Sequence, residues 1–254
     1  MRMEISSGCE HGIRNCQASY LHLTDDDNDY KVYAVVGLKE RNENVWGEFL
    51  SLRRTLHTEK RDYAEWHRGR NEYAVWMICI QSQSVQSRFD AARLHLAEFL
   101  LEPYRRQAHV TLFVCGFPAE IKRFRDDYTV EESERCIRAL KKAKPAPFEI
   151  KIGGINSFAA APFLEVFDIS GGIGRIRNLL SGTCSDIGNG EYMPHLTLGL
   201  YSGRFDTKMV AKKMSSFCHD SLITYFVDQI SLTTYSARRI AGPLAVKHVI
   251  DLEQ

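Results

Sequence analysis

Apolar and polar positions follow one another along the chain in patterns that predict strands and helices in turn. Residues 30–37 and 72–80 are rich in β-branched and aromatic side chains, so we expect a strand in each. Apolar residues between Val45 and Leu56 recur at helical spacing, which predicts a helix there. Residues 1–29 are polar, contain two glycines and end in an acidic run, and we expect them to form a loosely ordered arm.

From residue 72 onward, the same order of elements occurs twice. Each repeat consists of a strand, a helix, a second strand, a second helix and a third strand. The predicted elements of the first repeat are 72–80, 84–101, the strand that begins at His109, 130–143 and 148–152. Those of the second repeat are 162–169, 173–180, the strand that begins at His195, 207–218 and 226–232, and a last strand follows over 244–252. This order indicates an internal duplication, although the letters of the two halves do not match.

Local signals place several boundaries of these elements. Thr129 and Glu132 form a capping-box pattern at the start of the second helix. Ser84 is expected to cap the first helix of the first repeat. Gly116 and Pro118 are expected to end the strand that begins at His109.

Two His-x-Thr segments, 109–112 and 195–198, lie at equivalent points of the two repeats. They are 86 positions apart and share the longer pattern His-apolar-Thr-Leu-x-apolar. Roughly 0.4 His-x-Thr matches are expected by chance in a chain of this composition, and we interpret residues 22–24, which no apolar strand follows, as such a match. Residues two apart on a strand point to one face, so each segment directs a histidine and a threonine to the same side.

Two such segments that face each other would supply an acid, a base and two hydroxyl groups to one site. In-line displacement at phosphorus needs one imidazole to take a proton from the attacking oxygen and another to give a proton to the departing oxygen. The threonine hydroxyls would hold the non-bridging oxygens as negative charge develops on them. This chemistry requires no metal ion and no cofactor, so the sequence predicts neither.

Composition restricts the class of protein. Of the 254 residues, 44% are apolar, but we find no apolar run long enough to cross a bilayer and no secretory signal, so we expect a cytoplasmic protein. The seven cysteines include no Cys-x-x-Cys pair, which favours buried thiols over a metal clip or a disulfide framework. A net charge of +1 argues against a protein that coats long nucleic acid, but it is compatible with a local basic cleft for a nucleotide or an RNA end.

The paired motifs resemble those of the 2H phosphoesterase superfamily, whose bacterial branch includes the RNA 2',3'-cyclic phosphodiesterases, also called 2'-5' RNA ligases. The residues that carry the resemblance are His109-Val-Thr111-Leu and Pro194-His195-Leu-Thr197-Leu-Gly199, together with segments 154–158 and 163–166. The resemblance covers about 70–252, so we divide the chain into an N-terminal extension over 1–70 and a domain over 71–254. It implies an α/β fold of the α+β type with two lobes, each an antiparallel sheet flanked by helices, around a central cleft that carries both motifs.

The resemblance also implies an activity and a set of site residues. A relative of these enzymes would open a 2',3'-cyclic phosphate of an RNA end or a nucleotide, with one histidine as acid and the other as base and with both threonines on the phosphate. Several RNA-ligase-like members place an arginine soon after a motif, whereas this chain has Phe113 and Leu200 there. The candidate substrate-binding residues are instead two cations and two aromatic rings near the motifs: Arg106, Arg204, Phe117 and Tyr201.

Other functions remain open at this point. The same motifs suit a phosphodiesterase that acts on a 2'-5'-linked oligonucleotide or an ADP-ribose cyclic phosphate, and the same cleft suits a nucleotide- or RNA-binding module without turnover. The basic stretch over 53–70 is either a solvated helix face or a guide for RNA toward the cleft. We expect a monomer that binds no membrane.

Overall fold

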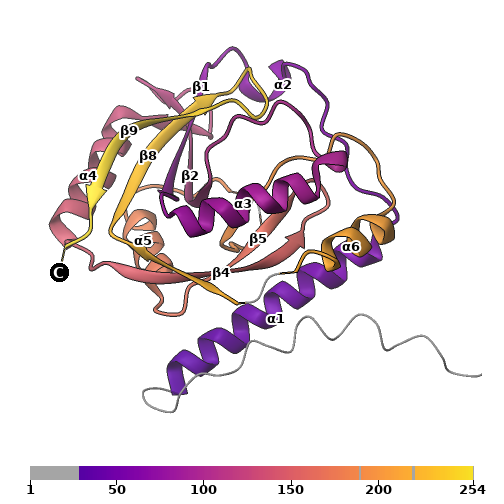
Figure 1. The fold of residues 1–254 in the computed structure, drawn as a ribbon. Helices are drawn as coiled ribbons and strands as arrows, with labels where there is room; N and C mark the ends of the chain where they lie inside the picture. Colours follow the sequence, from indigo (N-terminus) through magenta and orange to yellow (C-terminus); the bar gives the residue numbers. More distant parts are fainter. Residues whose placement is uncertain (1–28, 189, 219–220, 254) are drawn as a thin grey trace, which may run out of the picture.

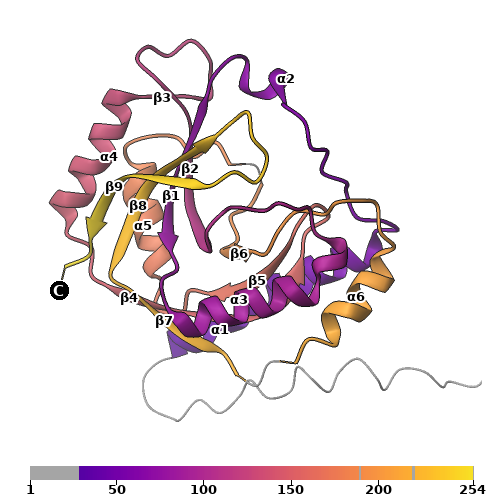
Figure 2. The same cartoon turned by 45° about the horizontal axis from the view of Figure 1, so that its top comes forward.

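The computed structural model describes residues 29–188, 190–218 and 221–253, with side chains from residue 39 onward. These residues form a nine-stranded sheet that curls, with helices packed against it (Figures 1 and 2). The helices are α1 (Asp29–Ser51), α2 (Ala64–His67), α3 (Gln83–His95), the 3-10 turn η1 (Ala97–Phe99), α4 (Val130–Ala143), α5 (Gly172–Ser181) and α6 (Thr207–Ser215). The strands are β1 (Glu72–Cys79), β2 (His109–Ala119), β3 (Asp127–Thr129), β4 (Phe148–Ser157), β5 (Pro162–Phe167), β6 (His195–Thr197), β7 (Ile223–Val227), β8 (Gln229–Ser236) and β9 (Leu244–Asp251).

The strands lie in the order β7-β4-β5-β6-β2-β1-β8-β9, and all neighbours in this order are antiparallel. β3 lies off this path and pairs in parallel with the end of β2. The predicted α/β class of the α+β type, with antiparallel strands and flanking helices, is therefore confirmed. The predicted separation into two lobes is not confirmed, because one sheet runs through both repeats and they meet at β2 and β6.

The last strand of each repeat pairs with the other repeat. β4 closes the first repeat in sequence but lies beside β5 of the second, and β8 lies beside β1 of the first. The single strand predicted over 226–232 is in fact two strands, β7 and β8, which separate at Asp228 and belong to opposite ends of the sheet. The two repeats are therefore interlocked by strand exchange.

The alternation of the two motifs places their apolar residues in the core. Val110 and Leu112 of β2 and Leu196 and Leu198 of the β6 segment are 0% exposed. Helices α3, α4, α5 and α6 contribute apolar side chains to the same cluster. Since neighbouring residues on a strand point to opposite faces, the histidine and threonine of each motif point away from this core.

The first described segment is a helix and not the predicted strand. Residues 30–37 belong to α1, which begins at Asp29 and has 23 residues. Strand propensity acts through packing against neighbouring strands, and no strand of the described sheet pairs with residues 30–37. The predicted N-terminal arm and the chance match at 22–24 lie outside the described residues.

Residues 52–58 form part of the folded domain. They run beside 201–207, where the backbone N–H groups of Thr55 and Thr58 donate to Phe205 and Tyr201 at 2.9 Å each. The Leu56 N–H donates to the carbonyl of Ala159 at 2.7 Å. Residues 52–58 of the predicted N-terminal extension are therefore hydrogen-bonded to the predicted domain.

The local boundary signals had mixed outcomes. The capping box is confirmed, because the Thr129 hydroxyl accepts from the Glu132 N–H at 3.2 Å and the Glu132 carboxylate accepts from the Thr129 N–H at 2.8 Å. The N-cap of α3 is Ser82, so the prediction of Ser84 was wrong.

The predicted end of β2 was also wrong. The strand continues through Gly116 and Pro118 to Ala119, where it pairs with β3. Proline is tolerated at position 118 because pairing with β1 ends at Gly116, so no antiparallel neighbour needs the missing N–H.

Two further expectations concern membranes and thiols. No helix among residues 29–188, 190–218 and 221–253 has both the length and the apolar character that crossing a bilayer requires. The cysteines in these ranges are free thiols, of which Cys115 and Cys136 are buried, Cys79 and Cys184 are half-buried and Cys218 is exposed.

Gly172 lies where α5 approaches β4, and replacing it by alanine is expected to destabilise the fold. An added Cβ would lie 2.0 Å from Cγ of Phe148, a buried side chain that has no room to move. The free energy of unfolding should fall by about 1–3 kcal/mol or more, as for other overpacked sites. Gly174→Ala in the same helix is the matched control, because its Cβ meets nothing within 4 Å and alanine favours the helix by up to about 1 kcal/mol. Equal urea midpoints for the two variants would contradict the close packing.

Candidate active site

The two His-x-Thr segments lie on neighbouring antiparallel strands. Val110 of β2 pairs with Leu196 of β6. Extending this register by one residue in each direction sets His109 opposite Thr197 and Thr111 opposite His195. Cross-strand partners point to the same face of a sheet, so the four predicted catalytic side chains share one face with a local two-fold arrangement. The structure thus brings together the residues that the sequence paired.

Both imidazoles are held by the same backbone contact. Nδ1 of His109 lies 2.8 Å from the carbonyl oxygen of Gln107, and Nδ1 of His195 lies 2.8 Å from that of Met193. A carbonyl oxygen only accepts hydrogen bonds, so each Nδ1 carries the proton and donates. In the neutral tautomer, Nε2 of each ring then has a free lone pair. The two rings are therefore prepared in the same way for proton transfer at Nε2.

Burial keeps both imidazoles neutral in the free protein. It lowers the pKa of His109 from 6.5 to about 4, against the opposing effect of the hydrogen bond to Gln107. The charges of Arg106 and His195 lower the pKa of His109 further, which places both groups in its electrostatic neighbourhood. Burial also lowers the pKa of His195. A bound phosphodiester anion would act in the opposite direction, since a negative charge stabilises the protonated imidazole.

Arg106 is the predicted cation that lies near the motifs. Its guanidinium lies 4.0 Å above the ring centroid of Tyr235, and its Nε is buried without a hydrogen-bond partner among the described residues. An unpaired buried N–H is costly unless a ligand or water accepts from it. Arg106 is therefore placed to donate to an anionic group beside His109.

Phe117 and Tyr201 do not offer a surface for a base, so this prediction is corrected. Both side chains are 0% exposed. The ring of Phe117 is covered by the Arg70 guanidinium at 3.5 Å and contacts Trp66 at 5.0 Å between centroids. The hydroxyl of Tyr201 lies 2.7 Å from the Ser157 hydroxyl inside the core. Stacking on either ring would require the fold to open.

Two other phenylalanines lie beside His195, and the sequence did not single them out as site residues. The rings of Phe158 and Phe163 lie 5.0 Å and 5.5 Å from the His195 ring, between centroids, in edge-on geometry. Phe163 is buried, whereas Phe158 is partly exposed at the end of β4. For Phe158, the only signal available from the sequence was its position in segment 154–158, which belongs to the family pattern. Phe158 replaces Phe117 and Tyr201 as the aromatic candidate next to a histidine.

A half-buried carboxyl group also lies on the histidine face. Glu165 of β5 pairs with His195 of β6, so the two side chains point to the same side of the sheet. The Glu165 carboxyl accepts from Nδ2 of Asn156 at 3.1 Å, and Nδ2 also donates to the carbonyl of Asn42 in α1 at 2.9 Å. Burial raises the pKa of Glu165 to about 7. Helix α1 therefore packs over the same face of β4 and β5 that carries His195, and it shields this carboxyl from solvent.

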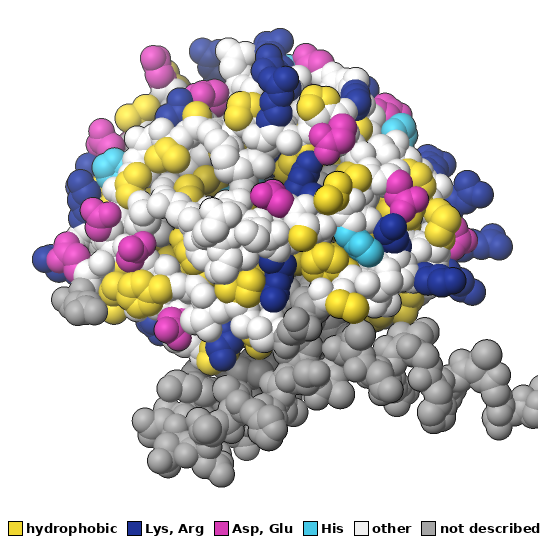
Figure 3. Space-filling view, viewed as in Figure 1, with side chains coloured by type: hydrophobic (Ala, Val, Ile, Leu, Met, Phe, Trp, Pro, Cys, Tyr) yellow, Lys and Arg dark blue, Asp and Glu magenta, His cyan; other side chains and the backbone are white. Residues whose placement is uncertain are grey.

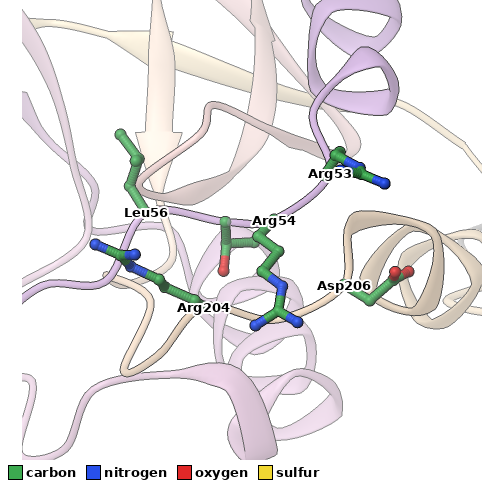
Figure 4. Close-up of a pocket in the computed structure, with 6 residues that line it drawn as sticks. Arg53, Arg54, Leu56, Arg204 and Asp206 are labelled. Atoms are coloured by element: carbon green, nitrogen blue, oxygen red, sulfur yellow. The ribbon is translucent and has the colours of Figure 1, made fainter.

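Arg204 lies elsewhere. It is exposed after β6 and lines a hollow together with Arg53, Arg54 and Asp206 (Figure 4). This hollow contains neither histidine of the motifs.

Within the described ranges, no group of three or more His, Cys, Asp or Glu side chains could hold a metal ion.

Comparison with known proteins gives one match to a family and several to solved structures. A sequence profile of the 2'-5' RNA ligase superfamily matches residues 81–239, more than half of the chain. E. coli LigT in complex with ATP is 13% identical, the match covers 73% of this chain and 100% of LigT, and the TM-score is 0.46. The Thermus thermophilus protein TT0787 is 15% identical over 71% of this chain and 97% of its own, with a TM-score of 0.49. Kluyveromyces marxianus Usb1 with uridine monophosphate is 10% identical over 73% and 99%, with a TM-score of 0.42. No curated protein matches the chain.

Proposed function

Because the chain belongs to the 2'-5' RNA ligase superfamily of 2H phosphoesterases, we propose that it is a phosphodiesterase that opens the 2',3'-cyclic phosphate of an RNA end or a nucleotide. Membership of this family supports a phosphodiesterase-type activity. The observation that carries the finer proposal is the register of β2 and β6, with His109 opposite Thr197 and Thr111 opposite His195. A pure binding module has no need of two imidazoles that are both prepared for proton transfer at Nε2.

The proposed reaction is one in-line displacement at phosphorus. One histidine takes a proton from water at its Nε2, and the water oxygen forms a bond to phosphorus. The bond from phosphorus to one ribose oxygen breaks, and the other histidine, in its protonated form, gives its proton to that oxygen. The threonine hydroxyls donate to the non-bridging oxygens, where negative charge increases in the transition state. The product is a nucleoside monophosphate or an RNA end with a phosphate monoester.

The direct test is hydrolysis of the four nucleoside 2',3'-cyclic phosphates and of a short RNA that ends in one. The reactions contain EDTA, because the proposed chemistry uses no metal ion. Turnover of at least one of these substrates is the expected result. Turnover of only a 2'-5'-linked oligonucleotide or an ADP-ribose cyclic phosphate would move the assignment to another phosphodiester. Tight nucleotide binding without turnover of any substrate would favour the binding module.

The lowered pKa values predict an unusual pH dependence. The enzyme is active only when one imidazole is neutral and the other is protonated. The fraction of enzyme in this state declines when the pH rises above the higher of the two imidazole pKa values. Since both pKa values lie below 6.5 in the free protein, kcat/KM should peak on the acidic side of pH 6.5 and then fall about tenfold per pH unit. The falling limb of kcat should lie at higher pH, because the bound phosphate anion raises the pKa of the acid.

The variant Glu165→Gln tests how much the carboxyl group beside His195 contributes to this pH dependence. The Glu165 carboxyl, with its pKa of about 7, gains negative charge in the interval where kcat/KM declines. That charge favours protonated His195 and makes the decline shallower, so the decline should be steeper in the variant. A value of kcat/KM that stays level or rises between about pH 6.5 and 8.5 in both proteins would contradict the assignment of two neutral imidazoles in the free protein.

A further inference from the structure

A hollow of about 740 Å³ lies where the segment after α1 passes the segment before α6. Its lining residues are Arg53, Arg54, Thr55, Leu56, Arg204 and Asp206. Figure 4 shows that these residues come from two segments of chain that run side by side. Arg54 and Asp206 form an isolated antiparallel bridge, and the Thr55 hydroxyl donates to the carbonyl of Gly203 at 2.8 Å. The backbone of the hollow is therefore held in place from both sides.

The hollow is positively charged. Arg53, Arg54 and Arg204 are all exposed, and none of them forms an ion pair with a described acidic residue. Asp206 is the one acidic residue in the lining, and its carboxylate caps α6 by accepting from the N–H groups of Lys208 and Met209 at 3.0 Å and 3.1 Å. Figure 3 shows further Lys and Arg side chains at the edge of the molecule where α6 lies in Figure 1.

Guanidinium groups suit phosphate oxygens in particular. Their planar set of N–H donors matches two oxygens of one phosphate, which gives both charge and geometry. Leu56 lies at the same hollow with 57% of its surface exposed, so an apolar surface lies beside the cations. A ribose or base next to a phosphate would cover this surface.

A short chain of contacts connects the hollow to the candidate active site. Leu56 is hydrogen-bonded through its backbone to Ala159. Ala159 follows Phe158, whose ring lies 5.0 Å from the ring of His195. A ligand that extends from His195 past Phe158 would therefore reach the side of the molecule that holds Arg54 and Arg204.

We propose that this hollow binds a backbone phosphate of a polynucleotide strand whose terminal cyclic phosphate lies between His109 and His195. The inference rests on the proposed function and specifies its substrate class as an oligonucleotide, in contrast to a free mononucleotide. A net charge of only +1 is compatible with this arrangement, because one or two phosphate contacts need a local cluster and not a basic surface over the whole protein.

The test compares two double variants with equal loss of charge. Arg54→Ala/Arg204→Ala changes the hollow, and Lys141→Ala/Lys142→Ala removes two exposed cations at the end of α4, on the other side of the molecule (Figures 1 and 2). For each protein, KM and kcat are measured with a short RNA that ends in a 2',3'-cyclic phosphate and with a cyclic mononucleotide. The hollow variant should show an increase of about tenfold or more in KM for the RNA, because two guanidinium groups that bind the phosphate are lost, and no change for the mononucleotide. The control variant should resemble the wild type with both substrates.

A binding measurement separates this inference from the proposed function. Fluorescence anisotropy with a labelled RNA that ends in a 3'-phosphate needs no turnover. The plot of log affinity against log salt should be shallower in the hollow variant by about 0.7, for one single-strand phosphate contact. RNA affinity and salt dependence equal to those of the wild type would overturn the inference, whether or not the protein hydrolyses any substrate. An equal loss for RNA and mononucleotide would also overturn it, since the hollow would then contact the reacting nucleotide.

Discussion

Replacement of His109 or His195 by alanine is expected to lower kcat for a 2',3'-cyclic nucleotide by about 10²- to 10⁴-fold, because each change removes one partner of the acid-base pair. Each ring is held at Nδ1 by a backbone carbonyl, so Nε2 is the atom that alanine eliminates from the reaction. The double variant should be little slower than either single variant, since groups that act as one unit are not additive.

This experiment measures kcat and KM with a cyclic mononucleotide, together with the thermal unfolding midpoint of every variant. His57→Ala is the matched control, because His57 is exposed after α1 and belongs to neither motif. It should keep full activity on the mononucleotide. Activity that survives in both single variants, with folding intact, would eliminate the paired-histidine mechanism.

The parts of the fold that the sequence predicted correctly depend on local chemistry. The capping box of α4 is one example, since Thr129 and Glu132 satisfy each other's backbone within four residues. The alternation in 109–112 and 195–198 is another, because one buried face is enough to determine which side chains point outward. The resemblance to the 2H phosphoesterases rested on these same segments, and the match over 81–239 confirms it.

Phe117 failed as an aromatic candidate because residues from other segments cover its ring. Strict alternation would place Phe113 and Phe117 on the face of His109 and Thr111. The pairing with β1 instead shifts between Trp76 and Met77 and again between Ala74 and Val75. The first shift turns Phe113 to the core face, but the second restores the alternation, so Phe117 lies again on the face of His109 and Thr111. Phe117 is buried there because Trp66, Tyr73 and Arg70 cover its ring. Cover of this kind, by residues distant in the sequence, leaves no dependable signal in the letters.

The remaining errors concern contacts between distant parts of the chain. The hydrophobic pattern of 30–37 suits a strand or a helix, and the decision depends on whether a neighbouring strand is available. The pairing of β8 with β1 and the meeting of Arg54 with Arg204 each join segments that are about 150 positions apart. Such contacts follow from the packing of the whole domain, so the sequence alone did not place Arg204 in this hollow with Arg53 and Arg54.

The threonines of the motifs are expected to act through their hydroxyl groups. Thr111→Val and Thr197→Val should each lower kcat by about 10²- to 10³-fold, the usual loss when one donor to a developing negative charge is removed. KM should change little, because the charge on the non-bridging oxygens is largest in the transition state. Valine is also β-branched and suits a strand, so the fold of β2 and β6 should be preserved, and circular dichroism and the unfolding midpoint check this.

Serine provides the discriminating comparison at both positions. Thr111→Ser and Thr197→Ser retain a hydroxyl donor and lose one methyl group, so they should keep most of the activity that the valine variants lose. The opposite order, with serine as damaging as valine, would mean that the methyl group is what matters at these positions. In that case the threonines would only position the strands, and the negative charge would have to be stabilised by another donor, for which Arg106 with its unpaired Nε is the first candidate.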